Sequence, residues 1–140
     1  MIRIMFLCTA NSCRSQMAEG LARELGKGVI EAYSAGVIAV DVQPRAVEVM
    51  REIGIDISQH RSKVMDLQLM QAMDYVITLC DSGAAFCPST PGSVKRLHWS
   101  IKDPVGTVGP EDTVMREFRR ARDEIRERIV SFIQSLNNNN

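Results

Sequence analysis

A cysteine and an arginine frame a short polar loop near the start of the chain. The stretch CTANSCR, residues 8–14, follows an apolar run and precedes a helical pattern. The start of a helix exposes unpaired backbone N–H groups and the positive end of the helix dipole, so a loop that enters it can bind a tetrahedral oxyanion. Arg14 adds a two-pronged guanidinium clamp. We therefore predict an anion-binding loop made of Thr9, Ala10, Asn11, Ser12, Cys13 and Arg14.

The same loop predicts a reactive thiol at Cys8. The helix start and Arg14 place positive charge near the sulfur, which favours the thiolate, the nucleophilic form of cysteine. Ser15 is placed to donate a further hydrogen bond to that sulfur. A buried structural cysteine is the alternative, because free cysteines are often buried. The Asn, Ser and Arg that follow Cys8 favour the nucleophile, and Cys13 is expected to pack beneath the loop.

Two more cysteines follow a later apolar run. FLC ends at Cys8 and TLC ends at Cys80. If these two strands are neighbours, a disulfide can join their ends, because adjacent strands lie about 4.8 Å apart and a disulfide spans about 4.4 to 6.8 Å between α-carbons. Taken alone, Cys80 is equally well explained as a core residue. Cys87 stands seven positions further on, a distance of about 10 Å if the residues between are helical. We therefore predict a switch segment between Cys80 and Cys87, ordered when the thiols are reduced and displaced when they are joined.

An aspartate and the cysteine spacing complete the candidate chemistry. Asp103 precedes Pro104 in a loop after the last apolar run, where its carboxyl group could protonate a departing oxygen as a general acid. A simple Asp-Pro turn is the alternative. The gaps between the four cysteines do not match the paired short knuckles of structural zinc sites, so we expect no bound metal. His60 lies in a polar stretch and is expected to be solvated.

The elements that position these residues follow from the hydrophobic pattern. Four short apolar or β-branched runs predict strands, at residues 2–7, 29–34, 75–79 and 94–99. Helical patterns lie between or after them, at 15–25, 44–53, 65–73 and from about 111 to 136. Strands that alternate with helices predict an α/β fold, with a mostly parallel sheet covered by helices on both faces.

The composition indicates the number of domains, the partners and the cellular location to expect. The chain has 140 residues, of which 45% are hydrophobic, enough for one domain that we place at 1–136, with a disordered polar tail at 137–140. Lysine plus arginine equals aspartate plus glutamate, 17 against 17, so nucleic acid and anionic membranes are not expected partners. No run is long enough for a signal peptide or a membrane span. We therefore expect a cytoplasmic protein with reduced thiols.

The loop CTANSCRSQMAEG resembles the oxyanion loop of the low-molecular-weight protein tyrosine phosphatase fold, and the rest of the chain is similar to its thioredoxin-coupled arsenate reductase branch. The likeness covers nearly the whole chain, with YSAG at 33–36, GIDIS at 54–58, VITLCD at 76–81, CP at 87, VKRLHW at 94–99 and DP at 103. Phosphatases of this fold usually have Pro in place of Gln16 and lack the pair Cys80 and Cys87. The resemblance implies a four-stranded parallel sheet with the strands in the order 2-1-3-4.

What the resemblance implies for function is a relay of three thiols. Cys8 attacks arsenate held by the loop and Arg14, while Asp103 assists the loss of hydroxide. Cys80 then attacks Cys8, arsenite leaves, and Cys87 takes over the disulfide from Cys8. Thioredoxin reduces the resulting bond, so the electrons come from thioredoxin and no cofactor stays bound. Phosphate and sulfate are expected to mimic arsenate, and the protein is expected to act as a monomer.

The sequence departs from this family at two places. Ala10 stands where relatives often have glycine, so the loop must accept a β-carbon there. Some members bind potassium through an Asn, a Glu, a Ser and an Asp. Asn11, Glu19 and Ser34 match this set, but Lys63 stands where the Asp is expected. We therefore predict no potassium requirement, with the Lys63 ammonium in the place of the ion.

Two alternative functions stay open at this stage. A low-molecular-weight protein tyrosine phosphatase would use Cys8, Arg14 and Asp103 but would not depend on Cys80 or Cys87. A non-enzymatic thiol redox sensor would form the disulfides without turning over arsenate. Slow aryl phosphate hydrolysis is also compatible with a reductase, because arsenate and phosphate share shape and charge.

Overall fold

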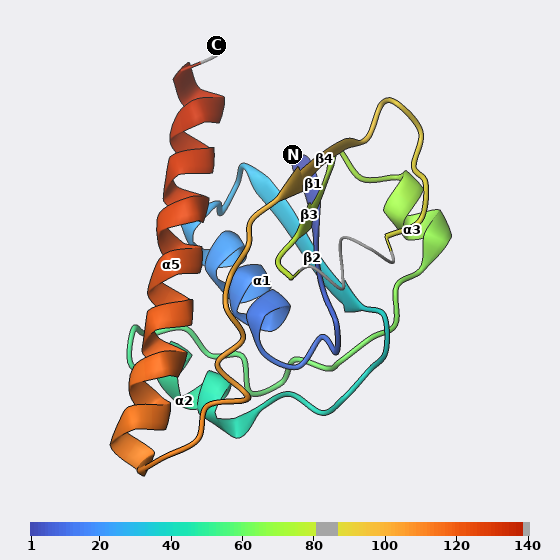
Figure 1. The fold of residues 1–140 in the computed structure, drawn as a ribbon. Helices are drawn as coiled ribbons and strands as arrows, with labels where there is room; N and C mark the ends of the chain where they lie inside the picture. Colours follow the sequence, from blue (N-terminus) through green and yellow to red (C-terminus); the bar gives the residue numbers. More distant parts are fainter. Residues whose placement is uncertain (81–86, 139–140) are drawn as a thin grey trace.

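The computed structural model describes residues 1–80 and 87–138, and its centre is a four-stranded sheet (Figure 1). All neighbouring strands pair in parallel, in the order β2-β1-β3-β4. The strands are β1 (Ile2–Cys8), β2 (Ile30–Gly36), β3 (Tyr75–Thr78) and β4 (Lys95–His98). The predicted strands, their direction and the order 2-1-3-4 are confirmed, with boundaries that shift by one or two residues.

Helices cover both faces of this sheet, as predicted. Their bounds are α1 (Arg14–Leu25), α2 (Pro44–Arg51), α3 (Leu67–Gln71) and α5 (Glu111–Asn138). In Figure 1, α1 and α5 lie on one side of the sheet and α3 on the other. The helix α3 is shorter than predicted because the side chain of Asp66 caps its start, accepting hydrogen bonds from the backbone N–H groups of Gln68 and Leu69.

The C-terminal helix runs further than the sequence predicted. The sequence predicts a disordered tail at 137–140, whereas α5 includes Asn137 and Asn138. The long apolar stripe of α5 anchors the helix on the core, and its final turn continues from that anchored part. The predicted switch segment between Cys80 and Cys87 lies outside the described residues.

Two hydrophobic clusters bury the two faces of the sheet. The larger one joins β1 to α1 and α5, through side chains such as Phe6, Met17 and Phe118. The smaller one lies on the α3 side and includes Met5, Leu7, Met70, Met73 and Val76. Alternate residues of β1 therefore enter opposite clusters, as expected for a parallel strand that is buried on both sides. None of the helices in the described residues combines the length and apolar character needed to span a membrane.

The candidate reactive residues lie near the carboxyl ends of the central strands. Beyond the paired residues of β3, the backbone N–H of Leu79 donates to the carbonyl of Leu7 at 2.8 Å. The N–H of Ile101 in turn donates to the carbonyl of Leu79 at 3.1 Å. The chain segments that follow β1, β3 and β4 are thus held side by side at the carboxyl edge, where open α/β sheets bind ligands.

Candidate active site

The loop between β1 and α1 is held from outside by the connector between β2 and α2. Val37 N–H donates to the carbonyl of Thr9 at 2.9 Å, and Gln43 N–H donates to the carbonyl of Ser12 at 2.8 Å. In a trans peptide the C=O and the next N–H point in opposite directions. The N–H groups of Ala10 and Cys13 therefore point away from the connector, the arrangement needed for a cradle of amides.

Asn11 takes the left-handed backbone conformation that the loop requires. Its φ angle is 50°, and among the described residues it is the non-glycine residue with positive φ. Asparagine tolerates this region better than most residues. The φ angle of Ala10 is not in this region, so the loop accepts the β-carbon that Ala10 carries in place of glycine.

Hydrogen bonds assign a direction to the contact between Cys8 and Ser15. The Cys8 sulfur and the Ser15 hydroxyl oxygen lie 2.8 Å apart, and the Asn11 side-chain amide donates to the same oxygen at 2.7 Å. The Asn11 side-chain oxygen accepts from Gln16 and from the backbone N–H of Lys63, which orients the amide. Because Ser15 accepts from Asn11, its own proton is available for the sulfur. This arrangement leaves the Ser15 proton available to a Cys8 thiolate, which is the role predicted for Ser15.

The chain of donors extends from the loop to His60. The Gln16 side-chain nitrogen donates to the Asn11 side chain, so its oxygen is left to accept from the ring Nδ1 of His60 at 3.0 Å. Nδ1 also lies 3.2 Å from the Glu19 carboxylate. Both neighbours are acceptors, so Nδ1 carries the hydrogen. The expectation that His60 is merely solvated is wrong, because its ring is enclosed between α1 and its own segment.

Replacing one donor in this chain of hydrogen bonds is expected to lower the reactivity of the Cys8 thiol. Asn11→Asp keeps the shape of the side chain but replaces the amide donor with an oxygen, so Ser15 would donate to the new carboxylate and leave the sulfur without a partner. A hydrogen bond to a charged group contributes about 1.5–3 kcal/mol, so alkylation of Cys8 by iodoacetamide at pH 7 should slow by about tenfold or more. Ser15→Ala is the matched control and should slow alkylation similarly. An unchanged rate in both variants would contradict the assigned direction.

Burial gives His60 a role in the pH dependence of stability. Burial lowers the pKa of His60, and Arg23 and Lys63 act in the same direction while Glu19 opposes them. Because the fold favours the neutral ring, the stabilisation is present above the unfolded pKa of about 6.5 and is lost as pH falls below it.

The variant His60→Asn keeps an N–H donor near the Nδ1 position but does not titrate. Urea unfolding between pH 8 and pH 5 should show wild type losing more stability than this variant, by on the order of 0.5 kcal/mol after solvent screening. Equal losses in the two proteins would contradict the assignment.

Arg14 and Asp103 meet at the loop, although 88 residues separate them in the chain. One Arg14 Nη donates to the carbonyl of Ile101 at 2.8 Å, and the other lies 3.5 Å from the Asp103 carboxylate. Arg14 is buried, whereas the Asp103 side chain is 49% exposed. The other Asp103 oxygen accepts from the backbone N–H of Val105 at 3.0 Å. Asp103 can therefore act as a general acid and also form the Asp-Pro turn, because one of its oxygens forms the turn and the other faces Arg14.

The four cysteines of the chain occupy different surroundings. Cys8, Cys13 and Cys80 are buried in the larger cluster, whereas Cys87 is half-buried against the smaller one. The Cys80 sulfur lies 3.2 Å from the Thr9 hydroxyl. Cys80 thus adjoins the residue that follows Cys8, because β1 and β3 are neighbours. Burial raises the pKa of the Cys13 thiol, which suits a packing role.

The positions at which some family members bind potassium do not suit such an ion here. Ser34 donates to the Glu19 carboxylate at 3.1 Å, and Arg23 lies 3.4 Å from its other oxygen. Desolvation lowers the pKa of the Lys63 ammonium, and the field of Glu19 opposes that shift. The cationic side chains of Arg23 and Lys63 would repel a metal cation next to Glu19.

Phosphate binding and the reactivity of Cys8 should therefore be insensitive to the alkali cation. Replacing sodium with potassium at constant ionic strength is expected to change either quantity by less than about twofold, because cations of the chain itself already face Glu19. Lys63→Asp restores the acidic residue and is the matched variant. Strong activation of wild type by potassium would contradict the prediction.

Sequence reasoning missed three residues that shape the site. Gln16 and His60 orient Asn11, and Gly36 lies against the loop: a β-carbon at Gly36 would lie 2.8 Å from the backbone nitrogen of Asn11. Gln16 carried a signal, because it stands where phosphatases of this fold usually have Pro. Nothing local in the sequence points to His60 or Gly36.

The fold and the loop define a class of protein. The family described as low molecular weight phosphotyrosine protein phosphatase matches residues 3–140, and the chain belongs to this family. An arsenate reductase of Halalkalibacterium halodurans is 47% identical over 132 residues, covering 94% of this chain and 95% of that protein. The arsenate reductase of Bacillus subtilis is 46% identical over 132 residues, which again cover 94% of this chain and 95% of that protein.

Solved structures give the same picture. An arsenate reductase in a phosphate binding state superposes with a TM-score of 0.77 at 35% identity, covering 96% of this chain and 98% of that one. A thioredoxin-dependent arsenate reductase of Corynebacterium glutamicum gives 0.81 at 26% identity, covering all of this chain and 64% of that one. A low molecular weight protein tyrosine phosphatase of T. tengcongensis gives 0.78 at 30% identity, covering 96% and 99%.

Proposed function

We propose that this protein reduces arsenate to arsenite in the cytoplasm, with thioredoxin as the electron donor. The observation that carries the proposal is that Cys8 ends β1 while Cys80 follows the neighbouring strand β3, where the Cys80 sulfur lies 3.2 Å from the hydroxyl of Thr9 in the anion loop. The relatives named arsenate reductase and the thioredoxin-dependent structural neighbour support it.

In the first step, the loop amides and Arg14 hold arsenate against Cys8. The Cys8 thiolate, which receives the Ser15 hydroxyl proton as a hydrogen bond, attacks arsenic and forms a sulfur–arsenic bond. A hydroxide leaves and takes a proton from Asp103, so that water is released. Arg14 stabilises the charge on the remaining oxygens throughout.

In the second step, the Cys80 thiolate attacks the Cys8 sulfur. The sulfur–arsenic bond breaks and its electron pair stays with arsenic, which becomes arsenite, while a disulfide forms between Cys8 and Cys80. Two electrons have passed from two thiols to arsenic, so the step balances. The spacing of adjacent strands is compatible with this bond.

In the third step, Cys87 attacks Cys80 and releases the Cys8 thiolate for another cycle. Cys87 packs against the smaller cluster, so it must leave that contact to reach Cys80. The resulting disulfide between Cys80 and Cys87 is the one that thioredoxin reduces, because thiol–disulfide exchange needs a sulfur that the attacking thiol can reach.

Anaerobic turnover with arsenate, thioredoxin, thioredoxin reductase and NADPH tests the proposal. We expect one arsenite released for each NADPH oxidised, and no turnover when thioredoxin is omitted. The phosphatase alternative predicts fast aryl phosphate hydrolysis without arsenite. The redox-sensor alternative predicts disulfide formation under oxidant, again without arsenite. Either result would overturn the proposed function.

A further inference from the structure

The segment that joins β4 to α5 presents two groups to Arg14. They are the carbonyl of Ile101 and the carboxylate of Asp103. Ile101 is anchored by its buried side chain and by its backbone bond to Leu79. Beyond Lys102, the hydrogen bonds of residues 103–107 within the described chain are internal to the segment, such as Val105 N–H to Asp103 and Thr107 N–H to the carbonyl of Pro104. Besides its ion pair with Arg14 and the buried Pro104 that follows it, the position of Asp103 depends on what holds the peptide just before it.

That peptide is held by a side chain of α5. Arg120 donates from Nη2 to the carbonyl of Lys102 at 3.1 Å. The peptide joining Lys102 to Asp103 is planar, so fixing the Lys102 carbonyl sets the plane that carries the nitrogen and α-carbon of Asp103. The Asp103 side chain starts from that α-carbon, and its contacts with the Val105 N–H and with Arg14 then set the direction of its carboxylate.

Two carboxylates hold the Arg120 guanidinium in position. Its Nε lies 3.1 Å from Glu117 and its Nη1 lies 3.2 Å from Glu124, one turn away in each direction along α5. A planar guanidinium with both other edges engaged has its remaining nitrogen aimed in one direction. Intrahelical pairs alone would explain the two carboxylates, but they do not explain the bond to Lys102.

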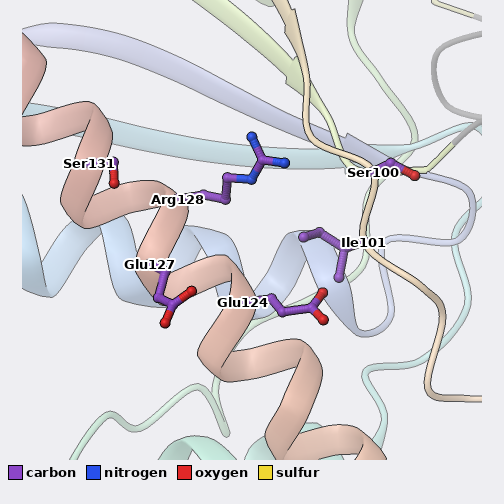
Figure 2. A pocket seen from close by; sticks show the side chains of 6 residues that line it. All are labelled: Ser100, Ile101, Glu124, Glu127, Arg128 and Ser131. Carbon is purple, nitrogen blue, oxygen red and sulfur yellow. The ribbon is translucent and has the colours of Figure 1, made fainter.

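Figure 2 shows the residues that line a pocket between the segment and α5, with Glu124 near Ile101. The pocket has a volume of about 270 Å³ and is lined by Ser100 and Ile101 on one side and Glu124, Glu127, Arg128 and Ser131 on the other.

We propose that Arg120 is a positioning residue for the reaction, which holds the Lys102–Asp103 peptide so that Asp103 meets the anion bound at Arg14. The inference rests on the proposed function for its assignment of Asp103 as the general acid. Arg120 itself touches neither substrate nor reacting thiols. Its effect on rate must therefore pass through Asp103.

A double-mutant cycle tests this dependence. Arg120→Met should lower kcat for arsenate about tenfold, with KM and the Kd for inorganic phosphate within about twofold of wild type. In the Asp103→Asn background, the same change should lower kcat by less than about twofold, because the group that Arg120 positions is already inactive. An equal fold loss in both backgrounds would overturn the proposal.

Arg119→Met is the matched control. Arg119 neighbours Arg120, carries the same charge and pairs with Glu52 on the α2 side, with nitrogen and oxygen 2.8 Å apart. This variant should keep wild-type kcat. Arg120→Leu also removes every donor at this position and serves if the methionine variant does not fold, in which case an unchanged kcat would overturn the proposal.

A second readout separates this inference from the proposed function. The backbone amide resonances of Asp103 and Val105 should shift in Arg120→Met and stay in place in Arg119→Met. If wild type reduces no arsenate, the proposed function fails while these resonances still report whether Arg120 holds the segment. Unmoved resonances in Arg120→Met would overturn the inference whatever the protein catalyses.

Discussion

Cys87→Ser is expected to release about one arsenite per protein and then stop, because Cys8 and Cys80 can still complete the first two steps. The product should be a disulfide between Cys8 and Cys80, and this bond should persist because the serine cannot attack it. Peptide mapping under non-reducing conditions identifies the bond. Steady turnover should fall by about a thousandfold or more.

Cys80→Ser is the informative partner of this variant. It should release no arsenite at all, since nothing resolves the adduct on Cys8, but it should bind phosphate with unchanged affinity because the loop and Arg14 are intact. Steady arsenite production by either variant would contradict the order of the relay. The two variants differ only in which sulfur is lost, so a general folding defect would not produce this pattern.

Gly36→Ala is expected to damage the anion loop without touching any reactive group. An added β-carbon would lie 2.5 Å from the carbonyl oxygen of Ile38, 2.8 Å from the nitrogen of Asn11 and 2.9 Å from the carbonyl carbon of Ala10. These are backbone atoms, which cannot rotate out of the way. The loop must shift, so we expect a loss of about 1–3 kcal/mol in stability and at least a tenfold weaker phosphate affinity.

Gly92→Ala is the matched control for this prediction. A β-carbon at Gly92 meets no atom within 4 Å, and its φ angle lies outside the left-handed region, so stability and phosphate binding should be nearly unchanged. Urea unfolding and calorimetric titration with phosphate measure both quantities. Wild-type affinity in Gly36→Ala would show that the loop tolerates the shift.

The local parts of this protein were predictable because they depend on near neighbours in the chain. The hydrophobic pattern predicted the four strands, and the Cys8 to Arg14 stretch predicted the loop, since the start of a helix exposes donors wherever it occurs. Errors appeared where distant contacts decide. The ring of His60 is enclosed because α1 presents Gln16 and Glu19 to it, and no pattern around residue 60 records that.

The amino-acid sequence by itself determined the alternation of strands and helices and the presence of a nucleophile before a helix start. These features arise from side-chain periodicity and backbone donors, which act over a few residues. Only the tertiary structure decided that one oxygen of Asp103 faces Arg14, that the Asn11 side-chain amide donates to Ser15, and that His60 lies against Gln16. Each of these depends on packing between segments far apart in the chain, where the burial of a whole sheet sets the distance between single atoms.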